Sequence, residues 1–471
     1  MSRKSTLIRS VLCLAALATC LFAESLHAEV RTVPAPKGNA VTDAYRIEVD
    51  GQDVAVYRSR DQEPGSGEYY FATFEFDGEV SIKITAPFDL SNATVAPERF
   101  GVEIAERNEQ TALLKAREPF MISFEPNGRV KPLILFGMVP ETDAPKEGDE
   151  NVLYFGPGVH SPGVVNLTDN QTLYVAAGAV LNAGINAKGE NITIRGRGVV
   201  SGSNWERFKG PSAFIINARN CKNLQIRDLV LRDPWSWTCV LTNCENAVVD
   251  GLRICASNMI NDDALDLCNS RNIEVKNCFF RAQDDSIAIK GHGGAACEKI
   301  NIHDCVFWTD RANIFRVGYE CGAEAMCDIT ATDIDVLYYS VNYRAPSDYW
   351  ANAIVWLQPN QQMLMSNCAF DSIRVRSNGD DIIMLMAKPM KCTYGEIQDP
   401  TPGRVANCVL KNFTVYGERG AFRGTLHFEG FSEECFVKNI TLENFNYFGE
   451  KITKDSPCVE IGNFVEGVEI K

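Results

Sequence analysis

The second half of the chain repeats one short pattern, and this repeat restricts the fold more than any other feature. Five segments carry apolar residues at offsets 0, +2, +5 and +7, and their first residues are spaced by 23, 26, 27 and 29 positions. These first residues are Leu224, Ala247, Ile273, Ile300 and Ile329. Offset +4 is always a residue that tolerates a turn, namely Asp228, Gly251, Asn277, Asp304 or Asp333.

The pattern predicts stacked coils of short strands. Alternation at offsets 0 and +2 places two side chains on one face of a strand, and the residue at +4 marks a bend before alternation resumes on the next strand. A single coil cannot bury its apolar face alone, so neighbouring coils must stack. We therefore expect a right-handed parallel β-helix over residues 151–471, with the five first residues in one inward column.

Residues 29–145 show a different pattern. Short alternating segments are divided by turn signals and helical periodicity is absent, which predicts a small antiparallel β-sandwich. The expected strands include Tyr45–Val49, Phe71–Phe76, Val80–Thr85 and Phe120–Phe124. The polar stretch at 140–150 has the composition of a linker between the two domains. The expected fold class is therefore all-β.

The first 28 residues resemble a secretory signal peptide. Basic residues at positions 3, 4 and 9 precede a short apolar run at 11–23, and a small residue, Ala28, ends the segment. This order predicts export to the periplasm or the medium after cleavage near Ala28. An alternative is anchoring as a lipoprotein through Cys20. No other apolar run is long enough to suggest a membrane span.

Charge and cysteine content restrict the partners. The formal net charge of −15 argues against nucleic acid and anionic membranes as ligands.

The cysteines allow separate predictions. The cysteines and histidines show no spacing typical of zinc ligands, so zinc is not expected. The predicted fold and site imply no other metal and no organic cofactor. Cys278 and Cys305 stand at offset +5 and are expected to be small buried apolar residues. Cys221 and Cys244 would be neighbours in adjacent coils, where a disulfide is geometrically possible. The oligomeric state is left open.

A group of aspartates could carry chemistry. Aligning the strands that precede each repeat places Asp263, Asp285 and Asn313 at equivalent positions, with Trp237 one coil earlier. Neighbouring coils lie about 4.8 Å apart, so these carboxylates would stand close together, and Asp284 would add a third. Carboxylates that raise one another's pKa supply a protonated acid beside an ionised base, as glycoside hydrolysis requires.

The same residues allow a purely structural interpretation. Together with Asp262, the aspartates could be turn residues that bind local backbone N–H groups. Adjacent strand residues face opposite ways, so Asp284 and Asp285 can both face a groove only if the chain bends there.

Side-chain alternation suggests further groove residues. Asp266, Lys290 and Arg316 would share the outer face. Lys290 and Arg316 could hold a sugar carboxylate or sulfate, or Asp266 and Arg316 could form an ion pair. His292, which lies between two glycines, would sit at the rim, and Trp237 could stack on a sugar ring.

Two segments resemble a known family. Residues 261–266 read Asn-Asp-Asp-Ala-Leu-Asp and residues 283–289 read Gln-Asp-Asp-Ser-Ile-Ala-Ile, which is similar to the polygalacturonases of glycoside hydrolase family 28. The resemblance implies a hydrolase that inverts the anomeric centre and cleaves a polysaccharide such as a pectin-like uronan. It also implies that Asp284 is the general acid and that Asp263 and Asp285 activate water.

Other features depart from that family. Its Gly-His-Gly motif is missing, and residues 312–318 stand in its place. The N-terminal sandwich and residues 154–160 are more similar to the dextranases and isopullulanases of family 49, which act on neutral α-glucans. Two alternatives of other classes remain: a carbohydrate-binding protein without activity on the same scaffold, and a polysaccharide lyase.

Overall fold

The computed structural model describes residues 29–37, 42–60, 67–256, 259–292, 294–339, 352–379, 383–391, 400–419 and 425–471, without the side chain of His292. The predicted signal peptide and Cys20 lie outside these residues. Within the described ranges, no helix has the length and apolar character needed to cross a membrane.

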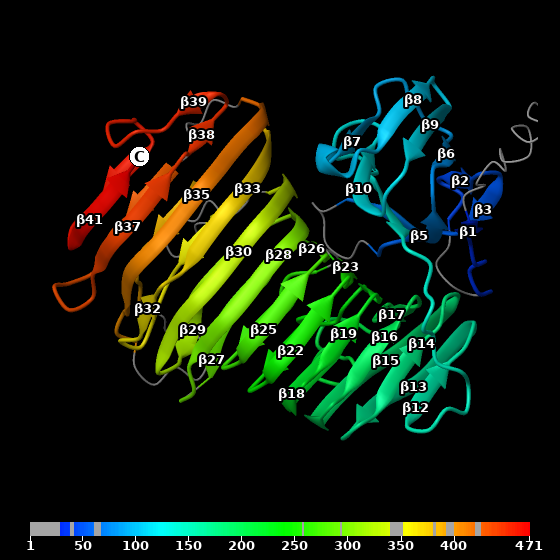
Figure 1. Ribbon diagram of the computed structural model, residues 1–471, viewed down its shortest axis with the longest axis horizontal. Helices are drawn as coiled ribbons and strands as arrows, with labels where there is room; N and C mark the ends of the chain where they lie inside the picture. The colour runs from blue at the N-terminus through cyan, green and yellow to red at the C-terminus, as the bar shows by residue number, and fades with distance from the viewer. Residues whose placement is uncertain are drawn as a thin grey trace, which may run out of the picture.

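The N-terminal strands form two packed sheets, shown in blue and cyan in Figure 1. One sheet contains β1 (Glu29–Arg31), β5 (Tyr70–Asp77), β11 (Leu133–Met138), β10 (Phe120–Glu125), β7 (Thr94–Ala96) and β4 (Val56–Arg58). The other contains β3 (Gln52–Val54), β2 (Arg46–Val49), β6 (Val80–Thr85), β9 (Thr111–Ala116) and β8 (Glu103–Arg107), and one 3-10 turn, η1 (Glu98–Phe100), precedes β8. The sandwich and its expected strands are confirmed, except that β5 and β11 pair in parallel.

The later strands form a right-handed parallel β-helix with three faces, apart from the antiparallel pair of β38 and β39 near the end of the chain. The first face contains β18 (Ile216–Lys222), β21 (Cys239–Thr242), β24 (Leu265–Cys268), β27 (Ile287–His292), β29 (Phe315–Gly322), β31 (Val355–Leu357), β34 (Ile383–Ala387), β36 (Thr425–Phe428) and β40 (Val459–Ile461). The second contains β16 (Thr193–Gly196), β19 (Gln225–Arg227), β22 (Glu245–Asp250) and β25 (Arg271–Lys276). The third contains β17 (Val199–Ser201), β20 (Val230–Arg232), β23 (Arg253–Cys255) and β26 (Phe279–Ala282).

Longer strands pass from the second face to the third, and others close the ends of the helix. The long strands are β28 (Cys297–Thr309), β30 (Ala325–Tyr338), β33 (Ala369–Asn378) and β35 (Arg404–Glu418). The first coils contain β12 (Val152–Phe155), β13 (Gly158–Leu167), β14 (Thr172–Val175) and β15 (Ala179–Glu190). The last contain β32 (Leu364–Ser366), β37 (Val437–Glu443), β38 (Asn446–Tyr447), β39 (Glu450–Lys451) and β41 (Val465–Ile470).

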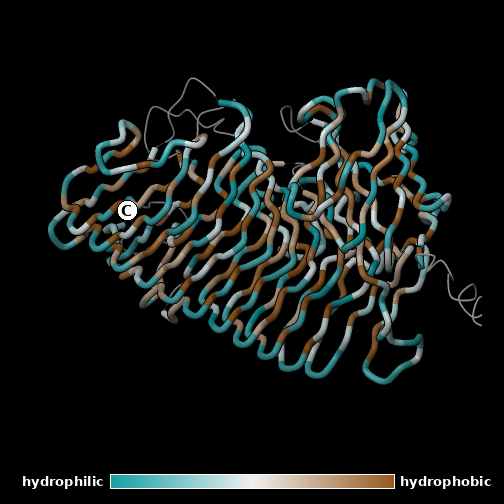
Figure 2. The backbone as a smooth tube through the Cα atoms, turned by 45° about the horizontal axis from the view of Figure 1, so that its top comes forward, coloured by the Kyte–Doolittle hydropathy of each residue, from teal (hydrophilic) through white to brown (hydrophobic). Residues whose placement is uncertain are grey.

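The predicted inward column is confirmed. Strand pairing places Ala247 opposite Ile273, Ile273 opposite Ile300, and Ile300 opposite Ile329, and all of them are buried. In Figure 2 apolar and polar segments alternate along each coil, and polar residues gather at the row of turns along the lower edge. The stack is therefore driven by burial of the inward apolar residues of adjacent coils.

Two left-handed bends shape most coils. The bend at offset +4 has φ values of 63°, 65°, 52°, 54° and 55° in the five repeats, which explains the Asp, Gly and Asn residues there. A second bend precedes offset 0 and holds asparagines whose side-chain amides bond from coil to coil. This ladder joins Asn170, Asn191, Asn223, Asn246 and Asn272.

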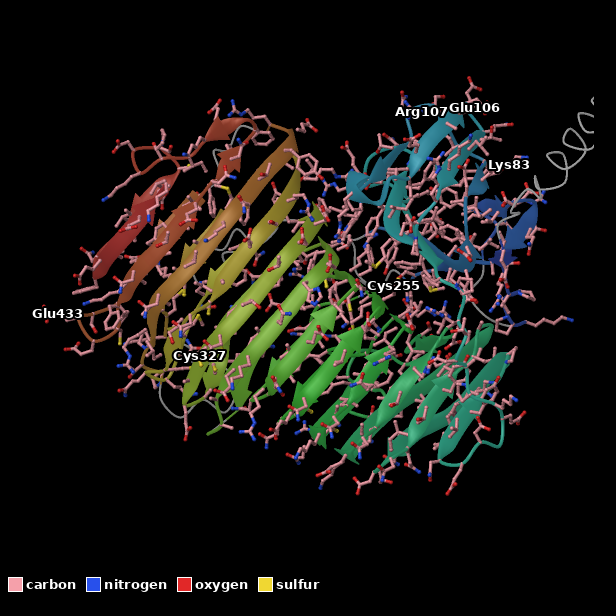
Figure 3. All side chains as sticks on the ribbon, in the orientation of Figure 1. Lys83, Glu106, Arg107, Cys255, Cys327 and Glu433 are labelled. Carbon is pink, nitrogen blue, oxygen red and sulfur yellow. The ribbon has the colours of Figure 1, made fainter. Side chains whose placement is uncertain are left out.

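The sandwich covers the third face of the β-helix. A shared apolar cluster contains Tyr69, Phe71 and Phe136 of the sandwich, and Val230 and Phe279 of the coils. The rings of Phe136 and Phe279 meet edge to face with centroids 5.2 Å apart. Another member of this cluster, Cys255, is labelled in Figure 3 between the two parts. The third face is therefore buried on both sides, with apolar residues and three buried arginines, Arg232, Arg253 and Arg281, on the side of the sandwich.

No disulfide joins the cysteines in the described part of the chain. Cys278 and Cys305 are buried in the core as predicted. Cys221 and Cys244 are free thiols, so the suggested disulfide is wrong. Both side chains act as small buried groups whose thiols face backbone carbonyls, with Cys221 Sγ lying 3.3 Å from Ala187 O.

Candidate active site

Three consecutive corners between the third and first faces hold the predicted residues. Leu265 pairs with Ile287, and Ile287 pairs with Phe315, so Asp263, Asp285 and Asn313 occupy equivalent positions as predicted. Backbone hydrogen bonds continue through these corners, because Ala264 N donates to Asp285 O at 2.9 Å and Ser286 N donates to Asn313 O at 2.9 Å. The stacking of the coils thus aligns the corners.

The corners bring three carboxylates together. One oxygen from each of Asp263, Asp284 and Asp285 lies within 4.8 Å of the other two. The chain leaves regular strand between β26 and β27, which is the bend that allows both Asp284 and Asp285 to join the group. Asp263 and Asp285 are buried, whereas Asp284 is partly exposed.

Asp262 is a structural turn residue. Its side chain is fully buried, and Oδ1 accepts hydrogen bonds from Gln283 N at 2.7 Å and from Asp284 N at 3.0 Å. It therefore ties the first corner to the second. The structural interpretation of the aspartates holds for this residue.

Asp284 is fixed by the backbone on both oxygens. Oδ2 accepts from Asn261 N at 3.1 Å, and Oδ1 accepts from Asp285 N at 3.0 Å. Burial, followed by the negative charge of Asp285, raises the pKa of the Asp284 carboxyl above its ordinary value. A raised pKa keeps a carboxyl protonated closer to neutral pH, as a general acid requires.

Lys290 is shared between several carboxylates of the site. Its Nζ lies 3.0 Å from Asp263 Oδ2, 2.9 Å from Asp266 Oδ1 and 3.5 Å from Glu320 Oε2. Burial alone would lower the pKa of Lys290, but these carboxylates together raise it well above its ordinary value. Burial raises the pKa of Asp266 to about 7, although Lys290 opposes this. Burial also raises the pKa of Asp263 well above its ordinary range, again against Lys290.

Asp285 is held by a different set of donors. Its Oδ1 accepts from Asn313 N at 3.1 Å and from Asn313 Nδ2 at 2.7 Å, and its Oδ2 lies 3.5 Å from Arg316 Nη1. The Asn313 Oδ1 atom accepts from Ala353 N at 2.8 Å. Arg316 also lies over the ring of Tyr319, with 3.6 Å between Cζ and the ring centroid.

Burial changes the expected roles of three groove residues. Alternation places Asp266, Lys290 and Arg316 on the outer face, but the first two are buried there and Arg316 is mostly covered. The ring of Trp237 lies 3.7 Å from Lys290 Nζ and covers it. Arg316 faces Asp285, so the suggested Asp266–Arg316 pairing is replaced by Lys290–Asp266 and Arg316–Asp285. Asn313, also buried, positions Asp285.

The remaining predicted residues lie at the edge of this group. Trp237 stacks on Phe214 with an interplanar angle of 12° and stays partly exposed. His292 ends β27, but its side chain lies outside the described residues. The sequence analysis did not identify Glu320 as a neighbour of Lys290. The pairing of β27 with β29 shifts register between Ile289 and Gly291, so simple alternation along β29 does not predict which way Glu320 faces.

Comparisons with known proteins identify the same segment. Residues 165–309, which carry the three carboxylates, match the family model described as Glycosyl hydrolases family 28. A probable polygalacturonase of Arabidopsis thaliana is 29% identical over 119 residues, which are 25% of this chain and 26% of that protein. The chain thus spans about a quarter of the length of the curated relative it matches.

Solved structures share the fold over most of the chain. Dex49A from Penicillium minioluteum superposes with a TM-score of 0.68 at 12% identity, covering 94% of this chain and 96% of that one. A family 28 exopolygalacturonase from Yersinia enterocolitica gives a TM-score of 0.50 at 14% identity, covering 83% and 96%. The predicted resemblance is confirmed: the chain is polygalacturonase-like, with additional similarity to Dex49A.

Proposed function

We propose that this polygalacturonase-like chain is a glycoside hydrolase of polysaccharides, and that Asp263, Asp284 and Asp285 carry the reaction. The observation that supports this most directly is the convergence of three carboxylates, within 4.8 Å of one another, inside the segment that matches family 28. A non-catalytic binding protein has no need for a cluster whose charges oppose one another.

The surroundings of each carboxylate suit a separate role. Asp284 is the most exposed of the three and its pKa is raised, so it is placed to donate a proton to the glycosidic oxygen. Asp285 is oriented by two donors from Asn313, and Asp263 by Lys290. Asp285 takes the proton of the attacking water, which Asp263 helps to hold in place, while the leaving sugar takes the proton of Asp284.

The stereochemical outcome is inversion by a single displacement. The resemblance to family 28 supports this proposal. The distances between the three carboxylates do not, because one oxygen of each lies within 4.8 Å of the others, whereas inverting enzymes usually separate the two carboxyl groups by about 6.5–9.5 Å. Proton NMR of the first product tests it. A product with the anomeric configuration of the substrate would require one aspartate to act as a nucleophile.

The sugar at the cleavage point has two candidates. The sequence resemblance favours a uronan, but Lys290 and Arg316, whose charges act on the three aspartates, already face protein carboxylates. That neutralisation favours an uncharged glycan, since a sugar carboxylate would need a cation of its own. Polygalacturonate and dextran, incubated separately and assayed by reducing ends and mass, distinguish the two.

Substitution tests the assignment of the acid. Asp284→Asn should retain the fold and lose roughly 10²–10⁴-fold in turnover. The exposed Asp455 offers a matched control, and Asp455→Asn should hydrolyse at the wild-type rate. Turnover of folded Asp284→Asn near the wild-type level would contradict the assignment. Products that absorb in the ultraviolet would instead indicate a lyase.

Export remains part of the proposal. The basic and apolar order of residues 1–28 supports cleavage near Ala28. Intact mass of the protein recovered outside the cytoplasm measures the cleavage site. A mass that includes a lipid on Cys20 would support the anchored alternative.

A further inference from the structure

Tyr69 lies at the centre of the contact between the sandwich and the coils that carry the carboxylates. It directly precedes β5 and is 1% exposed. Its hydroxyl donates to the backbone carbonyl of Ala256, and its ring lies 3.7 Å from the Cζ atom of Arg281. One side chain of the sandwich thus touches two adjacent coils.

Ala256 is the point where the first corner begins. It follows the end of β23, and the described chain resumes at Met259, four residues before Asp263. Its own N–H donates to Arg281 O at 3.0 Å, which joins it to the next coil. The Tyr69 hydroxyl therefore fixes the backbone on the approach to the first corner.

Arg281 and Asp310 extend the contact to the second and third corners. Arg281 precedes the corner that holds Asp284. Its Cζ atom lies 3.7 Å from the ring centroid of Tyr69 and 4.4 Å from that of Trp308. Asp310, on the approach to the third corner, accepts from Arg281 Nε at 3.1 Å and from Trp308 Nε1 at 2.9 Å.

A further hydrogen bond links the third corner to the acid. Thr309 Oγ1 donates to the backbone carbonyl of Asp284 at 3.2 Å. The cluster of Tyr69, Arg281 and Asp310 thus contacts the chain where it enters all three corners. A buried arginine–aspartate pair gives little net stability, so its value lies more in fixing geometry.

We infer that Tyr69 is a positioning residue for the reaction, which acts through Ala256 and Arg281 on the corners that hold Asp263, Asp284 and Asp285. The inference rests on the proposed function, because it assigns Tyr69 to the same site. It gives the sandwich a part in catalysis without contact with substrate. Small displacements of catalytic groups have large effects on rate, so an anchor where the chain enters the corners is expected to affect turnover more than binding.

Tyr69→Phe tests the hydroxyl with the ring retained. Tyr45 provides the matched control, because it is also buried in the sandwich and its hydroxyl donates to a backbone carbonyl, Lys131 O, at 2.6 Å. Both substitutions should lower thermal stability to a similar extent. Tyr69→Phe should lower kcat roughly tenfold with KM nearly unchanged, whereas Tyr45→Phe should leave both at wild-type values.

Hydrogen exchange supplies a measurement that needs no substrate. The backbone N–H groups of Asn261, Gln283, Asp284 and Asn313 all donate to corner carboxylates, so their exchange reports the order of the corners. Mass spectrometry should show severalfold faster exchange in these peptides for Tyr69→Phe and not for Tyr45→Phe.

The outcomes separate the two proposals. A wild-type protein that cleaves no glycan overturns the proposed hydrolase function, and exchange then still decides whether Tyr69 orders the corners. Wild-type exchange at the corners in Tyr69→Phe overturns the inference. Equal effects on the corner peptides in the Tyr45→Phe control overturn it as well, because the effect would then be general loosening of the sandwich.

Discussion

Removing the ammonium of Lys290 should destabilise the protein through the carboxylates that it balances. The side chains of Lys290, Asp263 and Asp266 are 3%, 4% and 0% exposed, so water does little to screen them. In Lys290→Met the stem volume is largely kept but Asp266 loses its cation. Breaking a buried pair in this way costs about 3–5 kcal/mol in the free energy of unfolding.

The cost should depend on pH in a defined direction. The pKa of Asp266 is about 7 in the intact protein and rises further without Lys290. Below about pH 7 the Asp266 carboxyl holds its proton in both the intact protein and Lys290→Met, so the difference between their free energies of unfolding becomes smaller. Above about pH 7 the intact protein ionises Asp266 beside Lys290, whereas the variant must keep this carboxyl protonated or, above its own higher pKa, bury an unpaired charge, so the difference in stability grows.

Urea unfolding followed by tryptophan fluorescence, near pH 6 and near pH 9, measures the effect. The double variant Lys290→Met/Asp266→Asn should recover about 2 kcal/mol of the loss, because a neutral amide at position 266 needs no cation. Lys438→Met is the control, since Lys438 pairs with Glu466 at 3.0 Å on the surface and should change stability by less than about 1 kcal/mol. A double variant less stable than Lys290→Met, or a cost independent of pH, would refute the reasoning.

Three further results are expected. Asn246→Ala should cost about 1–3 kcal/mol in unfolding free energy by chemical denaturation, because it loses two ladder hydrogen bonds and places alanine at φ 57°, while Asn246→Gly should cost less. Phe279→Ala should cost about 3–5 kcal/mol by the same measurement, because its ring fills the contact with the sandwich. The pH profile of kcat/KM should fall on the alkaline side at a pH above the ordinary carboxyl range, because Asp284 must be protonated to act and its pKa is raised; a fall near pH 4 would contradict this.

The repeat allowed the coil register to be predicted before the structure. Each inward residue at offset 0 follows from alternation within a few positions of sequence, which is a local property. The same register aligned Asp263, Asp285 and Asn313 correctly, because equivalent positions in stacked coils must be neighbours. What periodicity can predict is therefore the order of residues along each face.

Burial of the outer face could not be predicted in the same way. Lys290 faces outward as alternation requires, but Trp237 and Glu320 from other coils cover it, and contacts between coils at irregular corners have no period. The contact with the sandwich did leave a signal. Leu229–Leu231 is apolar at all three positions, which is typical of strands buried on both faces.

The left-handed bends also determine where this fold can accommodate changes in chain length. The corner at offset +4 has the same length in all five repeats, since one residue at positive φ makes the whole turn. The corners between the third and first faces have no common length, since Ile254 and Leu265 are 11 positions apart whereas Phe280 and Ile287 are 7 apart. A residue inserted in one of these corners, away from the residues that carry or bind the carboxylates, leaves every inward column in register. Evolution could therefore reshape substrate selection at these corners while the scaffold remains unchanged.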